Sequence, residues 1–252
     1  MPKPGKCGKS VNLLLLQSEE ELSPERRFIV TGERAEHIRT VLRAKVGDTV
    51  KTGILNGKIG NAVLLKLEKG RAELEAGEFS MSPPEGIPVS LIVSLPRPQS
   101  FRKVLHFAVS AGIKDLIFTH SARVEKSYWN STALSPEKIR EGVREGLEQG
   151  FDTREPNIRF YRYLKEFLKE SETLFPENAK RIIAHPGRPA GELKTEGKAL
   201  VLAIGPEGGY VESEIRAFAE AGFEPLSFGT HILRVEFAAA FITGFLMGGG
   251  SR

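Results

Sequence analysis

The chain has 252 residues, of which 40% are hydrophobic and 27% charged, so it can form one large domain or two smaller ones, each with its own core. Its net charge of +4 and pI of about 9.1 permit a nucleic-acid partner, but many proteins that bind none are as basic. No apolar run reaches the length of a membrane span, and the five His are scattered without metal-ligand spacing. We therefore expect no membrane span and no metal.

The N-terminal residues do not predict a signal peptide. Three lysines precede the four leucines at 13–16, but this apolar run is short and the acidic segment 17–21 follows directly. The single Cys7 excludes an intramolecular disulfide framework and fits a reducing compartment. These features predict a cytoplasmic protein.

The first part of the chain has the pattern of a small β-rich unit. A helix is predicted at 33–41, and the Asn56-Gly57 pair is a strong hairpin signal. The predicted strands are 27–30, 49–52, 61–67 and 71–74.

Basic side chains in this unit have two interpretations. As an RNA-binding surface, they would contact phosphates; as a solvated surface, they would alternate with Glu25, Glu33 and Glu36. The basic residues in question are Arg26, Arg27, Arg39, Arg43 and Lys45.

A linker rich in Pro and Gly at 80–86 predicts a domain boundary, with one domain at 1–80 and another at 87–252. Beyond the linker, a strand at 89–95, a helix closed by Gly112 and a second strand form a βαβ pattern. Such a unit indicates an α/β domain with a mostly parallel sheet and helices on both faces.

Helices and strands continue to alternate up to the C-terminus. Ser135 and Pro136 mark the start of one helix, by an N-cap hydroxyl and a proline at the first helical position. The final helix begins at about Val235 and is apolar nearly all round, so we expect it to be buried, against the sheet or a second subunit. The other predicted elements are a helix at 159–170, strands at 181–184 and 200–204, and a helix around Ile215.

The strand at 200–204 is apolar throughout and runs into Gly205-Pro206-Glu207-Gly208-Gly209. Gly205, Gly208 and Gly209 allow positive φ and close approach of a ligand. In parallel sheets, ligands bind at the carboxyl ends of strands. On these residues alone, an ordinary tight turn between a strand and a helix is an equally good interpretation.

A second stretch, Phe228-Gly-x-x-Ile-Leu-Arg-x-Glu236, follows another strand. Together, the two stretches resemble the SPOUT superfamily of knotted methyltransferases, and within it the family that methylates a uridine at N3 in 16S ribosomal RNA. The segment 37–48 is similar to the N-terminal barrel of that family. The resemblance implies a C-terminal SPOUT domain with a deep trefoil knot, preceded by a small PUA-like β-barrel that docks the RNA.

The resemblance also implies that three segments bind S-adenosyl-L-methionine. The first of them has a loose family motif, and a plain connecting turn is an equally good interpretation for it. The predicted residues are Ala184, His185 and Pro186, then Ile204, Gly205, Pro206, Glu207, Gly208 and Gly209, then Phe228, Gly229, Ile232, Leu233 and Arg234.

Uracil N3 becomes nucleophilic when its proton leaves or when negative charge on the base is stabilised, and a nearby cation serves the second purpose. By its place in the motif, Arg234 is the predicted cation, and Glu236 either orients it or caps the last helix. The family pattern also indicates Arg97 and Arg123 as RNA-binding residues.

The third motif departs from the family pattern, because Val235 and Phe237 stand where threonines are usual. The function predicted from the resemblance is methylation of a specific uridine at N3 in 16S rRNA, with 16S rRNA or the small ribosomal subunit as partner and a homodimer as assembly. Two alternatives stay open: a non-catalytic rRNA-binding factor that keeps the knot, and the same chemistry at a different RNA site.

Overall fold

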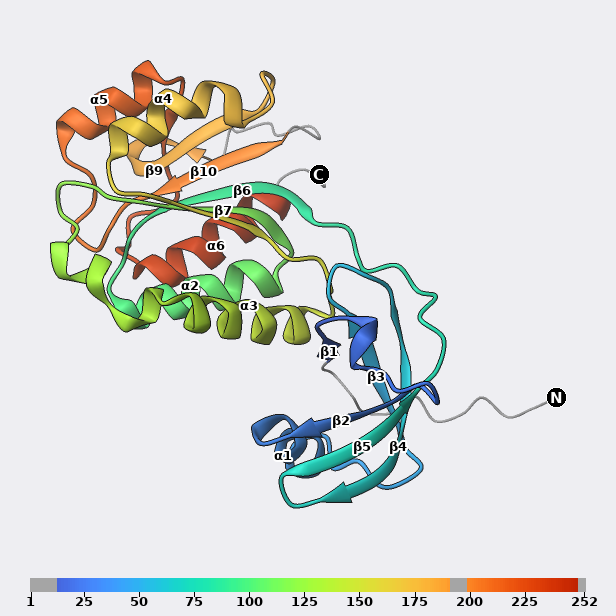
Figure 1. The fold of residues 1–252 in the computed structure, drawn as a ribbon. Helices are drawn as coiled ribbons and strands as arrows, with labels where there is room; N and C mark the ends of the chain where they lie inside the picture. The colour runs from blue at the N-terminus through green and yellow to red at the C-terminus, as the bar shows by residue number, and fades with distance from the viewer. Residues whose placement is uncertain (1–12, 191–198, 249–252) are drawn as a thin grey trace. The chain divides into compact units, whose positions relative to one another are not determined.

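The computed structural model describes residues 13–190 and 199–248 (Figure 1), so Cys7 lies outside the described residues. The chain divides into two compact units. The first comprises Met1–Glu85 and Leu147–Glu155, and the second comprises Gly86–Gly146 and Pro156–Arg252. The short stretch Leu147–Glu155 therefore belongs with the N-terminal unit, although it follows some sixty residues of the other one.

The first unit is built on a five-stranded sheet in the order β1-β3-β4-β5-β2, in which β1 and β3 are parallel and the other pairs antiparallel. Every strand predicted in this unit is present, and Asn56 has the positive φ of +57° that its hairpin signal indicates. Alternate side chains, among them Phe28, Val30, Leu64 and Leu74, fill the core. The elements are β1 (Leu14–Leu16), η1 (Glu19–Glu21), β2 (Arg27–Thr31), α1 (Glu33–Thr40), β3 (Thr49–Ile54), β4 (Ile59–Glu68) and β5 (Arg71–Ala76).

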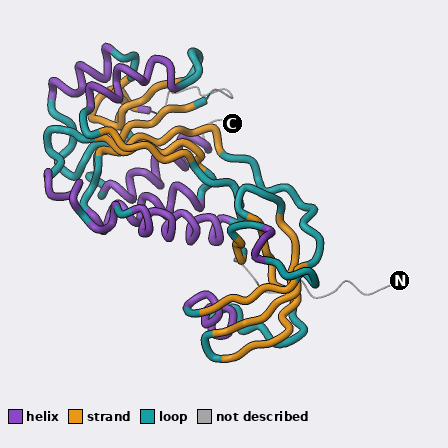
Figure 2. Tube along the Cα trace, in the orientation of Figure 1, coloured by secondary structure: helices purple, strands orange, loops and turns teal. Residues whose placement is uncertain are grey.

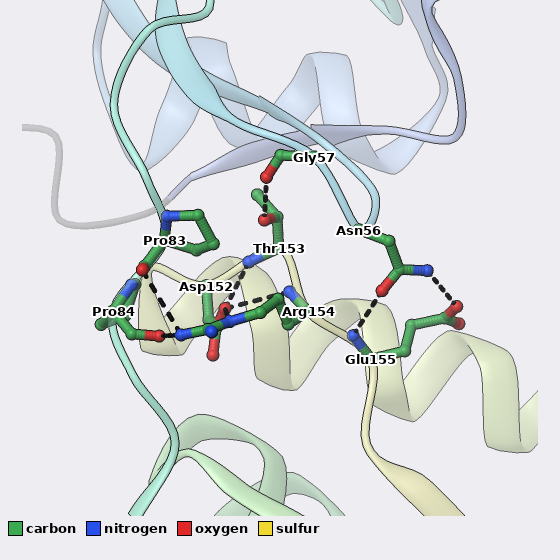
Figure 3. A network of polar contacts seen from close by, with 8 residues as sticks. All are labelled: Asn56, Gly57, Pro83, Pro84, Asp152, Thr153, Arg154 and Glu155. Carbon is green, nitrogen blue, oxygen red and sulfur yellow. Dashed lines mark hydrogen bonds and ion pairs between the residues drawn. The ribbon is translucent and has the colours of Figure 1, made fainter.

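A polar network holds the stretch Leu147–Glu155 in the first unit (Figure 3). The Asn56 side chain accepts from the Glu155 N–H at 2.9 Å and donates to its carboxylate at 3.0 Å. The Thr153 hydroxyl donates to the Gly57 carbonyl, and the buried Asp152 carboxylate accepts from the backbone N–H of Thr153 at 2.7 Å. The same stretch donates to carbonyls of the proline-containing linker. These bonds explain why the stretch, which begins in the last turn of α3, groups with the hairpin rather than with the rest of that helix.

The second unit has a six-stranded sheet in the order β11-β9-β10-β6-β7-β8, and every pairing in it is parallel. Helices α2, α3 and α6 cover one face, and α4 and α5 cover the other (Figures 1 and 2). The strands are β6 (Ile87–Ser94), β7 (Ile113–Thr119), β8 (Asn157–Tyr161), β9 (Lys180–Pro189), β10 (Leu200–Ile204) and β11 (Glu224–Ser227). The helices are α2 (Pro98–Ser110), η2 (Lys126–Asn130), η3 (Thr132–Leu134), α3 (Pro136–Gly150), α4 (Leu164–Leu174), α5 (Glu212–Glu220) and α6 (Val235–Gly248).

The start of α3 is as predicted, since the Ser135 hydroxyl accepts from the Lys138 N–H at 3.3 Å. The helix predicted at 159–170 is wrong in its first part. Residues Asn157–Tyr161 form strand β8, and α4 starts only at Leu164. Strand β8 pairs along the open edge of β7, and this pairing outweighs the local helical pattern.

Helix α6 is buried on one side only. Its buried residues include Val235, Ala239, Ile242 and Leu246. In contrast, Phe237, Phe241 and Phe245 are 56%, 52% and 41% exposed. Their spacing of four residues puts these rings on one face. The chain's own fold thus buries one face of this apolar helix and leaves the face with the three phenylalanines exposed.

Candidate functional site

A cavity of about 440 Å³ lies in the second unit, at the carboxyl edge of the parallel sheet. Strands β9, β10 and β11 are parallel, so the segments after their paired regions meet at this edge. The cavity brings together every residue predicted for the cofactor except Arg234. It is also lined by Arg123, Tyr210, Leu226, Ser227, Thr230, His231 and three residues of α6, namely Val235, Ala238 and Ile242.

The first cavity segment, 184–187, was expected in a loop and lies instead inside strand β9. Ile183 pairs with Pro225, whereas the next residue of β11 pairs with Arg188, so the four residues between them bulge out of the β9–β11 ladder. Because of this bulge, His185 lines the cavity, as expected for a loop residue. Burial lowers the pKa of His185, opposed by Glu212, and the imidazole is neutral near pH 7.

The second segment is the glycine turn, and the residues on either side of it, Ile204 and Tyr210, are joined by a hydrogen bond. Of the three glycines expected to use positive φ, only Gly209 does, at +71°. At Gly208 the constraint is space, because a Cβ there would lie only 3.0 Å from the Arg123 side chain. The buried Tyr210 hydroxyl donates to the Ile204 carbonyl at 3.0 Å, which joins the two ends of the turn. The sequence gives no motif for Tyr210, and only its position after Gly209 indicates a role.

Two arginines predicted to contact RNA lie against this turn. The Glu207 carboxylate accepts from the backbone N–H and from Nε of Arg97, both at 3.2 Å. The Arg123 guanidinium donates to the Gly208 carbonyl. Glu207 thus bonds a backbone amide outside its own turn, and both arginines are fixed beside the cavity.

The third segment connects β11 to α6. The Phe228 ring packs edge-on against Phe245, with ring centroids 5.6 Å apart. Ile232 is 98% exposed although it lines the cavity. Arg234 is also exposed, and its carbonyl accepts from the N–H of Ala238 at 2.8 Å, in the first turn of α6. The arginine proposed to act as the cation therefore lies between two lining residues, with its side chain in solvent.

Glu236 is tied to helix α2. Its carboxylate is only 5% exposed and accepts from Lys103 Nζ at 3.2 Å. Burial raises the pKa of Glu236, but hydrogen bonds from its own backbone N–H, from Ser100 and from Lys103 outweigh burial, and the pKa is lowered. Among the described residues, no hydrogen bond or ion pair joins Glu236 to Arg234. Lys103 was not predicted, because a lysine on an amphipathic helix carries no sequence signal of its own.

The other basic residues predicted to bind RNA belong to the first unit. Arg26 donates to the carbonyls of Ala76 and Gly77, and its guanidinium lies 5.7 Å from the centroid of the Phe79 ring. Arg27 pairs with Glu75 and Arg39 with Glu36, whereas Arg43 and Lys45 are exposed. Three of these five side chains thus bond within the unit itself.

The described part of the chain shows neither a metal-binding group nor a membrane-spanning helix. It contains no group of three or more His, Cys, Asp or Glu that could hold a metal ion. None of its helices is long and apolar enough to cross a membrane.

A parallel sheet covered on both faces, with a cavity at its carboxyl edge, defines a ligand-binding α/β domain. Residues 83–247 match the family described as RNA methyltransferase domain, and residues 30–76 match the RNA methyltransferase PUA domain. The chain belongs to this RNA methyltransferase family, and its first unit is PUA-like.

Three relatives illustrate the similarity. The ribosomal RNA small subunit methyltransferase E of Treponema pallidum is 28% identical over 238 residues, which are 91% of this chain and 88% of the relative. The crystal structure of the enzyme of the same name from Neisseria gonorrhoeae, bound to S-adenosyl methionine, is 25% identical with a TM-score of 0.69, over 94% of this chain and 97% of that one. A putative methyltransferase of Legionella pneumophila shares the fold at 20% identity and a TM-score of 0.73, over 94% and 96% of the two chains.

The Glu236–Lys103 contact predicts a pH-dependent contribution to stability. The folded pKa of Glu236 lies below the ordinary 4.5, so the contribution is complete above about pH 4.5 and is lost as the pH falls through the folded value. Glu236→Gln should lower the free energy of unfolding by about 1–3 kcal/mol near neutral pH. The difference from wild type should shrink below pH 4.5. Urea unfolding, monitored by the fluorescence of the single tryptophan Trp129, measures this difference in the free energy of unfolding.

Glu220→Gln is the matched control, because Glu220 is an exposed carboxylate on α5. It should change the free energy of unfolding by less than about 0.5 kcal/mol at any pH. If Glu236→Gln lowered the free energy of unfolding equally at neutral and acidic pH, the stabilising role of the ionised Glu236 carboxylate would be contradicted.

Proposed function

We propose that this protein transfers a methyl group from S-adenosyl-L-methionine to N3 of a specific uridine in the 16S rRNA of the small ribosomal subunit. The observation that carries the proposal is the single cavity in which three segments far apart in the sequence meet. The enzymes of Treponema pallidum and Neisseria gonorrhoeae are named as small subunit rRNA methyltransferases, and the latter was crystallised with the cofactor. Ribosomal RNA as substrate agrees with a cytoplasmic protein.

The cavity suits the cofactor in size and chemistry. Its volume of about 440 Å³ falls in the range of small-molecule pockets. Apolar side chains such as Leu226 and Leu233, together with the backbone amides of the glycine turn, suit a flat and weakly polar adenine. Gly209 leaves open space where any other residue would place a Cβ. His185 is neutral near pH 7 and so adds no positive charge that would repel the sulfonium.

When bound, the cofactor supplies an electrophilic methyl group. The methyl group would pass to uracil N3, whose proton would go to solvent water, and S-adenosylhomocysteine would be the leaving group. Arg234 would stabilise negative charge that develops on the base; it is exposed between two cavity-lining residues, and the first turn of α6 holds its backbone. Glu236 holds the start of this helix against α2 through Lys103.

The first unit would dock the substrate RNA, with Arg43 and Lys45 among its exposed cations. The division of labour between domains at 1–80 and 87–252, and the trefoil knot in the second, are parts of this proposal. The same chemistry at another RNA site would use the same cavity. A binding factor without catalysis is the alternative from another class, and it is favoured by Val235, which lines the cavity without the hydroxyl usual in the family.

Methyl transfer itself is the test of this function. Purified protein, labelled cofactor and small-subunit rRNA should give N3-methyluridine, identified by mass spectrometry of the nucleosides. Arg234→Ala should lower kcat about 10²- to 10³-fold, as the loss of one electrostatic stabiliser does, with little change in cofactor affinity. Arg216→Ala, which removes an exposed arginine from α5, should leave kcat unchanged. Cofactor binding without any methyl transfer would support the binding factor instead.

The glycine turn gives a second prediction. Gly209→Val should abolish cofactor binding, because φ of +71° disfavours a β-branched residue and the added side chain points into space next to the cavity. Gly222→Val is a matched control, since Gly222 has φ of +82° and equally open space, but lies at the end of α5 outside the cavity lining. Calorimetry should show normal affinity for the control. Loss of affinity in both variants would indicate general destabilisation and contradict the role of Gly209.

The exposed face of α6 supports a homodimer. Phe237, Phe241 and Phe245 form an apolar face that monomeric proteins rarely leave in water. Symmetric pairing of two copies of this face would cover it, and two-fold dimers are the commonest oligomers. Because α6 directly follows the third cavity segment, the partner copy would approach the cavity.

Light scattering should therefore give about twice the 27.7 kDa mass of one chain. Phe241→Glu should reduce this mass and methyltransferase activity together, because a charge in the apolar face opposes pairing. Ile29→Glu alters a residue of the first unit that is similarly exposed, and it should affect neither quantity. A wild-type monomer with full activity would disprove the dimer.

A further inference from the structure

Arginines and aromatic side chains gather outside the cavity at the same edge of the sheet. Strands β6, β7 and β8 run parallel to β10, so the loops that follow them reach the carboxyl edge where the cavity lies. The side chains that these loops contribute are Arg97, Arg123, Tyr128, Arg162 and Tyr163, which we call the edge patch.

Arg162 lies over an aromatic ring that is itself fixed in place. Its guanidinium carbon lies 5.1 Å from the centroid of the Trp129 ring. Trp129 is buried, and its Nε1–H donates to His120 Nδ1 at 3.0 Å, which fixes the indole. A cation over an aromatic ring is stabilised electrostatically, so Arg162 is held near Trp129 before any ligand binds. Arg162 is also exposed to solvent, so its guanidinium is accessible to a ligand.

The other two arginines of the edge patch are each held by a side-chain hydrogen bond. Arg97 uses its Nε–H for Glu207, and Arg123 uses Nη1 for the Gly208 carbonyl. A guanidinium has five N–H donors, so both keep donors for a further partner. Tyr128 lies on η2 in the connection after β7, and its hydroxyl donates to Glu125 at 2.9 Å. The edge patch is thus preorganised, and Arg123 also lines the cavity.

We propose that the edge patch binds a short single-stranded stretch of RNA beside the nucleotide that enters the cavity. A base stacks on the exposed guanidinium of Arg162, and Arg97 and Arg123 bond phosphates. Guanidinium planes and aromatic rings stack well on nucleobases, whose faces are accessible only outside a duplex. Because Arg123 belongs both to the edge patch and to the cavity wall, a strand bound there leads directly to the methyl donor. This inference rests on the proposed methylation of RNA.

Fluorescence anisotropy with a labelled single-stranded RNA of about ten nucleotides, within the usual size range of such sites, tests the proposal. Arg162→Met should weaken binding about tenfold, since the cation is lost and the methionine cannot stack as a planar group. The slope of log affinity against log salt should stay close to the wild-type value, because Arg97 and Arg123 make the phosphate contacts. Arg162→Lys keeps the charge without the planar fork, so it should bind with intermediate affinity and keep the wild-type slope.

Lys169→Met is the control, because it removes one exposed charge from the middle of α4. It should stay within about twofold of wild type. Affinity for an RNA duplex of equal length should change little in any of these variants. Equal single-strand affinity for Arg162→Met and Lys169→Met would overturn the proposal, and an equal loss for duplex and single strand would overturn the single-strand assignment.

Two further measurements separate this inference from the proposed function. Arg162→Met should raise KM for small-subunit rRNA about tenfold, with kcat and the Kd for S-adenosylmethionine unchanged. Wild-type kinetics in Arg162→Met would overturn the inference while the methyltransferase function stands. A wild-type protein that binds cofactor but methylates no rRNA would defeat the proposed function. The anisotropy series would still show whether the edge patch binds single-stranded RNA.

Discussion

Parallel pairing of β10 with β9 on one side and β6 on the other is the constraint on which the site depends. All five side chains of β10 are buried, so the strand can lie only inside the sheet. Because its neighbours run in the same direction, every carboxyl end in the sheet points to one edge. The glycine turn after β10 therefore meets the β9 bulge and the segment before α6, although these segments are up to forty residues apart in the chain.

Contacts behind the cavity hold these segments in place. Tyr210 closes the glycine turn on the carbonyl of Ile204, and Glu207 binds Arg97 from the loop after β6. Glu236 fixes the start of α6 to α2 through Lys103. A site whose wall is held by such secondary contacts needs less reordering when a ligand binds. Ile232 is the part of the wall that is left exposed, and Arg234 is exposed beside it.

The sequence predicts the fold well where local pattern and tertiary pairing agree. The strand at 200–204, the glycine turn and the βαβ pattern are all found in the structure. Prediction fails where partners distant in sequence decide the outcome. Residues Asn157–Tyr161 become a strand because the edge of β7 is open to them, and Leu147–Glu155 groups with the first unit through bonds to a hairpin some hundred residues away.

The candidate site shows the same limit. Motifs predicted 13 of the 22 residues that line the cavity as cofactor residues, because glycine turns at strand ends have a recognisable pattern. Motifs could not identify Lys103 or Trp129, whose roles come from Glu236 on another helix and from Arg162 after another strand. Positive φ was expected at three glycines, and the structure uses it at Gly209 alone. Backbone angles depend on how the turn closes, which the composition of the turn leaves open.

Convergence of three segments on one cofactor is the central claim, and hydrogen–deuterium exchange with and without S-adenosylmethionine tests it most directly. The cofactor should slow amide exchange together in peptides that cover 184–187, 204–210 and 226–235, because one ligand would contact all three. Peptides from the β-sheet of the first unit should not change. Protection of only one of these segments, or of residues elsewhere in the chain, would contradict the account.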